Sequence, residues 1–295
     1  MRIAVTGADG FVGRAVVREL AARGIGDVLL TDRAFAAPPP FEALAGDLAD
    51  PAVFARVAEA DAVLHLAALP GAAAEADPAA SRAVNLDLPL SLIEGMAGRR
   101  LVLASSIAVF GGRLEAPVDD VTVPTPTPTS VYGTHKRMTE LAFADAVRRG
   151  AVRGLALRLP GIVARPRGAG GFGSAFLSDL FHAARAGEAY TIPVAPDATS
   201  WLLSARAVAR ILVDAPLSDA TEGAAVTLPA LHVRIGTLVA ALGRAGDTSG
   251  FIYAEDARLR ATFGSYPPLA TPRAEALGFR ADADIDALID AAFDG

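Results

Sequence analysis

The sequence predicts an α/β protein with a doubly wound parallel sheet, and two observations carry that prediction. Short β-like runs alternate with helical stretches through the first half of the chain, which is typical of a parallel sheet covered by helices on both faces. In addition, Gly7, Gly10 and Gly13 stand three residues apart, between the first apolar run and the first amphipathic one. The 295 residues suffice for one large domain or for a main domain with a smaller partner.

The predicted elements follow in chain order. The predicted strands are RIAVT, DVLLTD, DAVLHLAA, RRLVLASS and RGLALRL. Apolar residues at helical intervals predict helices over FVGRAVVRELAARG, Pro78 to Met96, Ser130 to Arg149 and SAFLSDLFHAARAG. The stretches AAPPPFEALAG and VPTPTPTS are predicted to be connecting loops. Because the alternation weakens from Pro160 onward, we expect a nucleotide-binding domain over 1–159 and a smaller substrate-binding region over 160–295, with segments that return to the first domain.

Composition excludes several classes of function. A net charge of -6 without a long basic run argues against binding of nucleic acid. No apolar stretch reaches the roughly 18 residues of a membrane span, and no signal peptide is evident, so we expect no membrane association and no export. The absence of cysteine suits the cytoplasm, and the four histidines lack the spacing of a metal site. We therefore expect a cytoplasmic protein without a metal.

The glycine turn predicts a phosphate site. Gly7 can form a tight turn, Gly10 lets the backbone approach a pyrophosphate, and Gly13 lets the helix pack closely on the strand. The start of the following helix, at Phe11 and Val12, offers free amides and a partial positive charge to phosphates. The alternative is a strand-turn-helix without a ligand.

Asp32 favours a dinucleotide ligand. It ends the next predicted strand, 19 residues after Gly13, close to where dinucleotide-binding folds place an acidic residue that accepts from the adenosine ribose hydroxyls. The carboxylate would repel a 2′-phosphate, which favours NAD over NADP, although the adjacent Arg33 weakens that inference. The sequence therefore predicts a Rossmann-type domain that binds NAD.

A second pattern predicts the chemistry. Tyr132 and Lys136 are four residues apart in TSVYGTHK, so they share one face of a helix. A nearby ammonium and an oxidised nicotinamide favour the phenolate, which lets a tyrosine exchange a proton with a hydroxyl. Ser105 and Ser106 end the predicted strand of VLASSIAVFGG and supply a hydroxyl partner. The alternative for such a pair is a surface tyrosine beside a lysine.

Together these motifs resemble the extended short-chain dehydrogenase/reductase family of NAD-dependent epimerases, dehydratases and dehydrogenases. TGADGFVG, Asp32, GDL, LHLAA, Asn85, SSIAVFG and YGTHK fall in family order across nearly the whole chain. The resemblance implies that Tyr132 is the catalytic acid/base, that Lys136 binds the nicotinamide ribose, and that Ser106 is the catalytic hydroxyl, with Ser105 as its structural neighbour. The cofactor contacts that it implies are Gly7, Gly10, Phe11, Val12, Gly13, Asp32, Asp47, Leu48, Leu66, Ala67, Ala68, Asn85, Tyr132, Lys136 and Pro160. His65 is expected to pack or hydrogen-bond near the cofactor.

Further patterns narrow the branch of the family. Ile107 and Ala108 follow Ser106 where family dehydratases carry an Asp-Glu pair, and the short C-terminal region favours a small substrate over a nucleotide sugar. The stretches RLPGIVARPR, PVAPDATSWLLSARAV and ATPRAEALGF are similar to a branch that oxidises the four-carbon sugar acid D-erythronate at its 2-hydroxyl, while TSWLLS also resembles uronate dehydrogenases. Gly71 and Ala72 depart from that branch, whose members tend to carry a serine after HLAA.

The residues of the substrate site and the binding partners can also be predicted from the sequence and the resemblance. A carboxylate needs a cation, so Arg165, ahead of Arg167, is the candidate ligand, unless both arginines are solvated or paired with acids. Ser174, Ser178 and Trp201, together with Ser106 and Tyr132, are further substrate candidates, with helix packing as the alternative for the first three. The resemblance implies a homodimer. The rival functions are an epimerase that keeps its NADH and a non-catalytic dinucleotide sensor.

Overall fold

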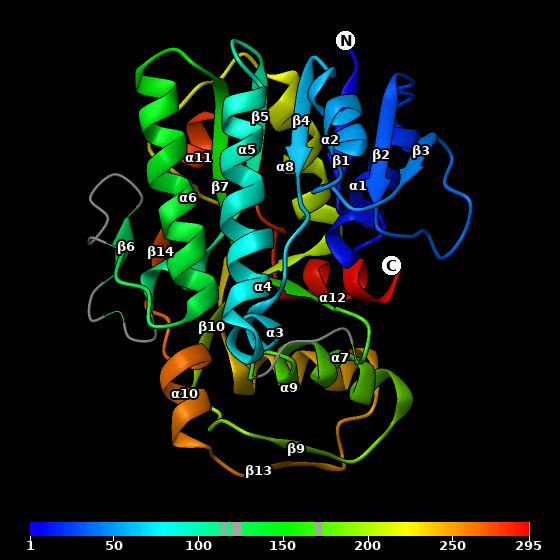
Figure 1. Cartoon of the computed structure of the whole chain (residues 1–295). Coiled ribbons are helices and arrows are strands. Elements are labelled where there is room, and N and C mark those ends of the chain that lie inside the picture. Colours follow the sequence, from blue (N-terminus) through cyan, green and yellow to red (C-terminus); the bar gives the residue numbers. More distant parts are fainter. Residues whose placement is uncertain (112–113, 115–116, 120–125, 169–172, 295) are drawn as a thin grey trace. The chain divides into compact units, whose positions relative to one another are not determined.

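The chain forms two compact units in a computed structural model that describes residues 1–111, 114, 117–119, 126–168 and 173–294 (Figure 1). Unit 1 comprises Met1–Ser106, Val131–Arg158 and Ala209–Val226. Unit 2 comprises Ile107–Ser130, Leu159–Val208 and Thr227–Gly295. The chain therefore returns to unit 1 after residue 208, and the segment 107–130 belongs with unit 2.

Unit 1 is a layered α/β structure. Its central sheet has the order β11-β7-β5-β4-β1-β2-β3, and the pairs that join β3, β2, β1, β4 and β5 are parallel. Its strands are β1 (Ile3–Thr6), β2 (Val28–Asp32), β3 (Glu42–Ala45), β4 (Ala62–His65), β5 (Arg100–Ser106), β7 (Arg153–Leu159) and β11 (Val226–Thr227). Its helices are α1 (Phe11–Ala22), α2 (Pro51–Ala58), α3 (Gly71–Ala76), α4 (Pro78–Arg82), the π-turn η1 (Ala83–Asp87), α5 (Leu88–Gly95), α6 (Val131–Arg148) and most of α8 (Ala205–Leu217). The predicted doubly wound α/β sheet is confirmed.

The order of the strands determines where a ligand can bind. The chain builds outward from β1 in one direction through β2 and β3, and in the other direction through β4 and β5. The connections therefore diverge between β1 and β4, and in open α/β sheets the crevice outside the carboxyl ends of such strands receives the ligand.

The inner strands of the sheet are buried because they carry apolar residues without polar alternation. Register pairs align Leu29, Ala4, Val63 and Leu101 in one row across four strands, and each of them is fully buried. This row lies in a core cluster with residues of α2, α5 and α6, among them Phe143. In Figure 1, α5 and α6 run side by side over the sheet. Residues on both faces of β1 and β4 are buried, as expected for a parallel sheet covered on both sides.

Two local predictions are corrected by the structure. The stretch AAPPPFEALAG is not wholly a loop, because Glu42–Ala45 forms the edge strand β3, which pairs with β2. The strand is short and largely exposed, so no apolar alternation marks it in the sequence. The helix predicted from Pro78 to Met96 is present as α4 and α5, but it contains the π-turn η1, a feature that is often found at functional sites.

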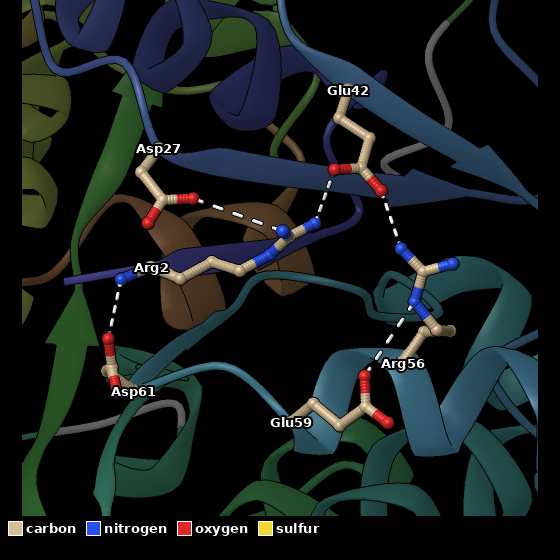
Figure 2. A network of polar contacts seen from close by, with 6 residues as sticks. All are labelled: Arg2, Asp27, Glu42, Arg56, Glu59 and Asp61. Atoms are coloured by element: carbon tan, nitrogen blue, oxygen red, sulfur yellow. Dashed lines mark hydrogen bonds and ion pairs between the residues drawn. The ribbon is translucent and has the colours of Figure 1, made fainter.

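A polar network joins the amino ends of the strands in unit 1 (Figure 2). The backbone N–H of Arg2 donates to Asp61 at 2.7 Å, and the Arg2 guanidinium pairs with Glu42 of β3. Glu42 also accepts from Arg56 of α2 at 2.6 Å. The hydrogen bond from Arg2 is the main cause of the lowered pKa of Glu42. This network lies at the edge of the sheet opposite to the carboxyl ends of its strands.

Unit 2 contains three small sheets. In the first sheet, β10 lies between β12 and β8; the second sheet pairs β13 with β9, and the third pairs β14 with β6. Its strands are β6 (Val118–Asp119), β8 (Gly161–Val163), β9 (Tyr190–Ile192), β10 (Thr199–Ser204), β12 (Leu231–Arg234), β13 (Phe251–Tyr253) and β14 (Leu269–Ala270). Its helices are the 3-10 turn η2 (Ile107–Phe110), α7 (Phe176–Ala186), α9 (Ile235–Ala245), α10 (Ala257–Phe263), α11 (Pro272–Ala276) and α12 (Ile285–Phe293). Apolar side chains of α7, α9 and α12 form its main core.

Candidate active site

The glycine turn connects β1 to α1 at the divergence point of the sheet. Gly7 has φ +69, and a Cβ there would lie 2.7 Å from the backbone nitrogen of Ala67, at the carboxyl end of β4. A Cβ on Gly13 would lie 2.1 Å from the carbonyl oxygen of Gly7. Both positions therefore require glycine for the packing of the turn itself.

Gly10 differs from the other two glycines. A Cβ there would meet the Gly7 oxygen at 3.2 Å, which is tight but far less severe, and its φ is -67. Gly10 is the exposed N-cap of α1, and no side chain caps this helix. The amides of the first turn, which includes Phe11 and Val12, are therefore not covered by a capping side chain. This cradle and the helix dipole fit a pyrophosphate.

Asp32 lies at the carboxyl end of β2, next to the glycine turn. Its Oδ2 accepts from the backbone N–H of Asp9 at 2.9 Å, and its Oδ1 accepts from Arg33 N at 2.8 Å. These bonds orient the carboxylate beside the turn. At the end of β3, Asp47 accepts from the Ala49 amide at 2.9 Å, and the neighbouring Leu48 is buried.

His65 and Thr6 join the carboxyl ends of β4 and β1. The two residues are register partners, and Thr6 Oγ1 lies 2.8 Å from His65 Nδ1. Thr6 Oγ1 also accepts from the backbone N–H of Ala67 at 3.3 Å, while Leu66 N donates to the Thr6 carbonyl. Burial, reinforced by the charge of Lys136, lowers the pKa of His65 to about 3, so the imidazole is neutral. Leu66 and Ala67 are half-buried, and Ala68 is exposed.

Asn85, which was expected to contact a cofactor, holds another backbone segment. Its Nδ2 donates to Leu69 O at 2.9 Å and to Ser81 Oγ at 3.0 Å, and its Oδ1 accepts from Leu69 N at 2.9 Å. The residue is fully buried in η1. Both N–H donors of the amide are thus used within the protein, and Asn85 fixes the segment that follows Ala67 and Ala68.

Lys136 is the sole lysine of the chain, and it is buried. Its Nζ donates to the Ala104 carbonyl of β5 at 2.8 Å and lies 5.6 Å from the centroid of the Tyr132 ring. Burial lowers the pKa of this ammonium to about 8, and the charge of Glu140 opposes that shift. Ser106 ends β5 two residues beyond Ala104 and is half-buried, as is Tyr132. The tyrosine and lysine thus share one face of α6, as predicted, beside the end of β5.

Sequence reasoning missed the buried ion pair of Glu140 and Arg158 next to this lysine. Glu140 accepts from Ser105 Oγ at 2.6 Å, and Arg158 of β7 donates to both of its oxygens at 2.8 Å. All three side chains are buried. The spacing of Tyr132, Lys136 and Glu140 at four-residue intervals was the available signal, because it places the three residues on one helix face.

Unit 2 holds the substrate candidates other than Ser106 and Tyr132, which belong to unit 1. Arg165 donates from its guanidinium to Ser174 Oγ at 3.0 Å and from its backbone N–H to Ser178 Oγ at 3.0 Å. His182, one helical turn after Ser178, lies with Nε2 at 2.6 Å from the Arg165 carbonyl oxygen. One face of α7 and the turn before it therefore hold Arg165. Sequence reasoning overlooked His182.

The remaining site candidates of unit 2 contact other side chains or backbone groups of the protein. Arg167 pairs with Glu188 at the surface. Trp201 is fully buried, and its indole N–H donates to Pro267 O at 2.7 Å, so the ring packs in a core cluster with Phe110 and Tyr266. Pro160 is buried between β7 and β8.

Neither a metal cluster nor a membrane span is evident where the structure describes the chain. Within that part, no three His, Cys, Asp or Glu side chains are grouped so that they could hold a metal ion. No described helix combines the length and the apolar character that crossing a bilayer requires.

Comparisons with known proteins show to which family the chain is similar. Residues 3–213 match the family described as the NAD dependent epimerase/dehydratase family. The chain is 36% identical to a D-erythronate dehydrogenase from Cupriavidus necator, over 98% of this chain and 97% of the other. It is 28% identical to a D-erythronate dehydrogenase from Haemophilus influenzae, over 98% of both chains. Among solved structures, it is similar to a nucleoside-diphosphate-sugar epimerase from Agrobacterium tumefaciens, with a TM-score of 0.86, 28% identity and coverage of 100% of this chain and 94% of the other.

Proposed function

The chain belongs to the NAD-dependent epimerase/dehydratase family, and we propose that it is a dehydrogenase that oxidises the 2-hydroxyl of D-erythronate to 2-oxo-tetronate (2-dehydro-D-erythronate). The observation that carries this proposal is the similarity of nearly the whole chain to two D-erythronate dehydrogenases. The contact between the buried ammonium of Lys136 and the Tyr132 ring supports it, because this pair can perform the required proton transfer.

In the proposed mechanism, the Tyr132 phenolate removes the proton of the substrate hydroxyl. The Lys136 ammonium stabilises that phenolate and would hold the nicotinamide ribose of a bound cofactor. Ser106 donates a hydrogen bond to the substrate oxygen and stabilises the charge that develops there. NAD, when bound, would supply the acceptor for the hydride of the same carbon, and the loss of one hydride and one proton would convert the alcohol to a ketone.

Residues of unit 1 are proposed to seat the cofactor. The glycine turn and the first turn of α1 would bind the pyrophosphate, because Gly10 leaves room for it and no side chain caps the helix. Asp32 would accept from the adenosine ribose hydroxyls and exclude a 2′-phosphate, which makes NAD the preferred cofactor over NADP. The further wall of this site is proposed to comprise Asp47, Leu48, Leu66, Ala67, Ala68 and Pro160.

Arg165 is the proposed ligand of the substrate carboxylate. A guanidinium can bind a carboxylate through two parallel hydrogen bonds. Ser174, Ser178 and His182 restrict the side chain and backbone of Arg165, which reduces the entropy lost on binding.

The proposal is tested by incubating the protein with NAD and D-erythronate and following NADH at 340 nm. We expect NADH to accumulate, faster with NAD than with NADP and faster than with D-glucuronate or D-galacturonate. Tyr132→Phe should remove most turnover and leave NAD binding intact. A preference for a uronate would contradict the assignment of the substrate, and an active Tyr132→Phe variant would contradict the mechanism.

A second candidate function is a sugar epimerase that retains its NADH. The similarity to a nucleoside-diphosphate-sugar epimerase favours it. Such an enzyme would interconvert a nucleotide sugar without net formation of NADH, so the same assay with UDP-glucose separates the two functions. A dinucleotide sensor would bind NAD without turning over either class of substrate.

A second copy of the chain is the proposed partner of α6. Met138 and Leu141 of this helix are 46% and 54% exposed, and apolar side chains so exposed on one helix indicate an interface. We expect a homodimer by light scattering. Met138→Glu together with Leu141→Glu should give monomers, and an unchanged mass would exclude this interface.

A further inference from the structure

Glu140 is a buried carboxylate with an unusually complete set of partners. Its side chain accepts from Ser105, from two nitrogens of Arg158 and from Arg137 at 3.0 Å. Arg158 and Ser105 are buried as well, whereas Arg137 is half-buried. The carboxylate therefore ties α6 to two strands of the sheet, β5 and β7.

These contacts hold the strand that carries the catalytic hydroxyl. Ser105 precedes Ser106, and Ala104 precedes Ser105. The Ala104 carbonyl accepts from Lys136 Nζ at 2.8 Å, and the Ser105 hydroxyl donates to Glu140 at 2.6 Å. The end of β5 is thus attached to α6 at two successive residues, directly before Ser106.

Packing alone does not account for a charged pair at this position. A buried ion pair loses hydration that its mutual attraction repays only in part, and apolar residues of similar size often stabilise a fold as well or better. The pair is therefore expected to have a task that requires charge. One helical turn before Glu140 on the same face is Lys136, whose ammonium must stay protonated to stabilise the phenolate.

Several charged or titratable groups surround Lys136. Glu140 favours its charged form, whereas burial opposes it. The charge of Lys136 contributes to the lowered pKa of His65 on β4, so a protonated His65 would repel the ammonium. On the elements that pack against α6, α3 contributes Glu75, which accepts from Val131 N, and α4 contributes Ser81, which lies against His135. The titratable or charged groups of this region are Tyr132, Glu140, Arg137 and His135 on α6, His65 on β4, Arg158 on β7, Glu75 on α3 and Asp87 on η1.

We propose that Glu140 is a positioning residue of the reaction: its carboxylate holds Ser105, and with it the strand end that carries Ser106, and its charge keeps Lys136 an ammonium. Arg158 orients the carboxylate through its two parallel hydrogen bonds. This role rests on the proposed dehydrogenase function for its effect on turnover, whereas its effect on Lys136 is measurable without any substrate.

The test uses the fact that the chain has a single lysine. Protein labelled with ¹³C at the lysine Cε gives one lysine signal, whose shift with pH reports the protonation of Lys136. In Glu140→Gln we expect the midpoint of this titration to fall by about one pH unit, because a charge about one helical turn away, roughly 6 Å, is lost. With D-erythronate, kcat should then decline with rising pH at a correspondingly lower pH than in the wild type.

Two further variants keep the test decisive. If Glu140→Gln fails to fold because Arg158 is left unpaired, Glu140→Gln with Arg158→Gln removes both charges, and its midpoint should fall by less, because the repulsion from Arg158 is lost together with the attraction to Glu140. Ser105→Ala keeps every charge, so its lysine midpoint should match the wild type while kcat falls about tenfold. Asp282→Asn is the matched control, since Asp282 is a buried carboxylate of unit 2 that accepts from Ser204, and it should leave the lysine midpoint unchanged.

The possible outcomes distinguish the proposed role of Glu140 from the proposed dehydrogenase function. An unchanged lysine midpoint in a folded variant without the Glu140 carboxylate overturns the electrostatic role, and a wild-type kcat in Ser105→Ala overturns the positioning role. If the wild type forms no NADH from D-erythronate, the proposed function fails, while the lysine titration still decides whether Glu140 controls the charge of Lys136.

Discussion

Replacing Lys136 by methionine should abolish turnover and stabilise the unliganded protein. Burial lowers the pKa of this lysine from 10.5 to about 8. At pH 7 the ammonium is therefore higher in free energy in the folded protein than in the unfolded chain. A fall of this size corresponds to roughly 3 kcal/mol. Loss of the hydrogen bond to the Ala104 carbonyl costs about 1 kcal/mol. We therefore expect Lys136→Met to raise the free energy of unfolding at pH 7 by about 2 kcal/mol.

The pH dependence has a definite sign. Between pH 8 and 10.5 the unfolded chain still binds the lysine proton while the folded protein has released it, so the wild type gains stability with rising pH from this group. Lys136→Met lacks that gain, and the difference between the two proteins should shrink across this window. Below pH 8 the difference should be constant.

Urea unfolding of the two proteins at pH 7, 8, 9 and 10 measures this difference. Arg148→Met is the matched control, because it removes an exposed cation of the same helix that pairs with Asp145, and it should change stability by less than about 1 kcal/mol. A Lys136→Met variant that is less stable than the wild type at pH 7, or whose advantage does not depend on pH, would refute the reasoning.

Three further perturbations have expected outcomes. Gly10→Ala should weaken NAD binding about tenfold or more, measured by calorimetry, with little change in melting temperature. Gly13→Ala should lower the melting temperature, because its Cβ would lie 2.1 Å from a backbone oxygen. Equal effects of the two variants on NAD binding and on melting temperature would contradict this distinction. The wild type should lose stability as the pH falls from 6.5 to about 3, because His65 binds a proton in the unfolded chain but stays neutral in the folded protein. His65→Leu should lose less stability over this range. Urea unfolding of both proteins at pH 7 and pH 4.5 measures the difference. Asp32→Ala should reduce the ratio of kcat/KM for NAD to that for NADP by about tenfold, and an unchanged ratio would assign the preference to other residues.

Much of the fold and part of the site could be predicted because their signals are local. The strands before the glycine turn and before Asp32, and the helix that carries Tyr132 and Lys136, are marked by apolar runs and by spacing within a few residues. The edge strand β3 was missed because it is short and exposed, so neither hydrophobicity nor alternation marks it.

The hydrogen-bond partners of the site residues could not be predicted from local sequence patterns. Glu140 meets Ser105 and Arg158, which lie 35 and 18 residues away in the chain, and nothing in its local sequence names those partners. The amide of Asn85 likewise bonds to Leu69 and Ser81, while the cofactor contact that the resemblance implies for this residue stays a prediction. Contacts of this kind depend on how the elements pack, which single-residue patterns do not encode.

The sequence by itself determined the kind of chemistry, because a glycine turn, an acid at the end of the next strand and a Tyr-Lys pair one helical turn apart are each defined over a short stretch of chain. Only the tertiary structure decided how these groups are charged and held. The burial that lowers the pKa of Lys136 to about 8, the Glu140 carboxylate that opposes this shift, and the neutral state of His65 arise from loss of water and from charges brought near by folding. Both effects depend on distance in space and not on distance along the chain.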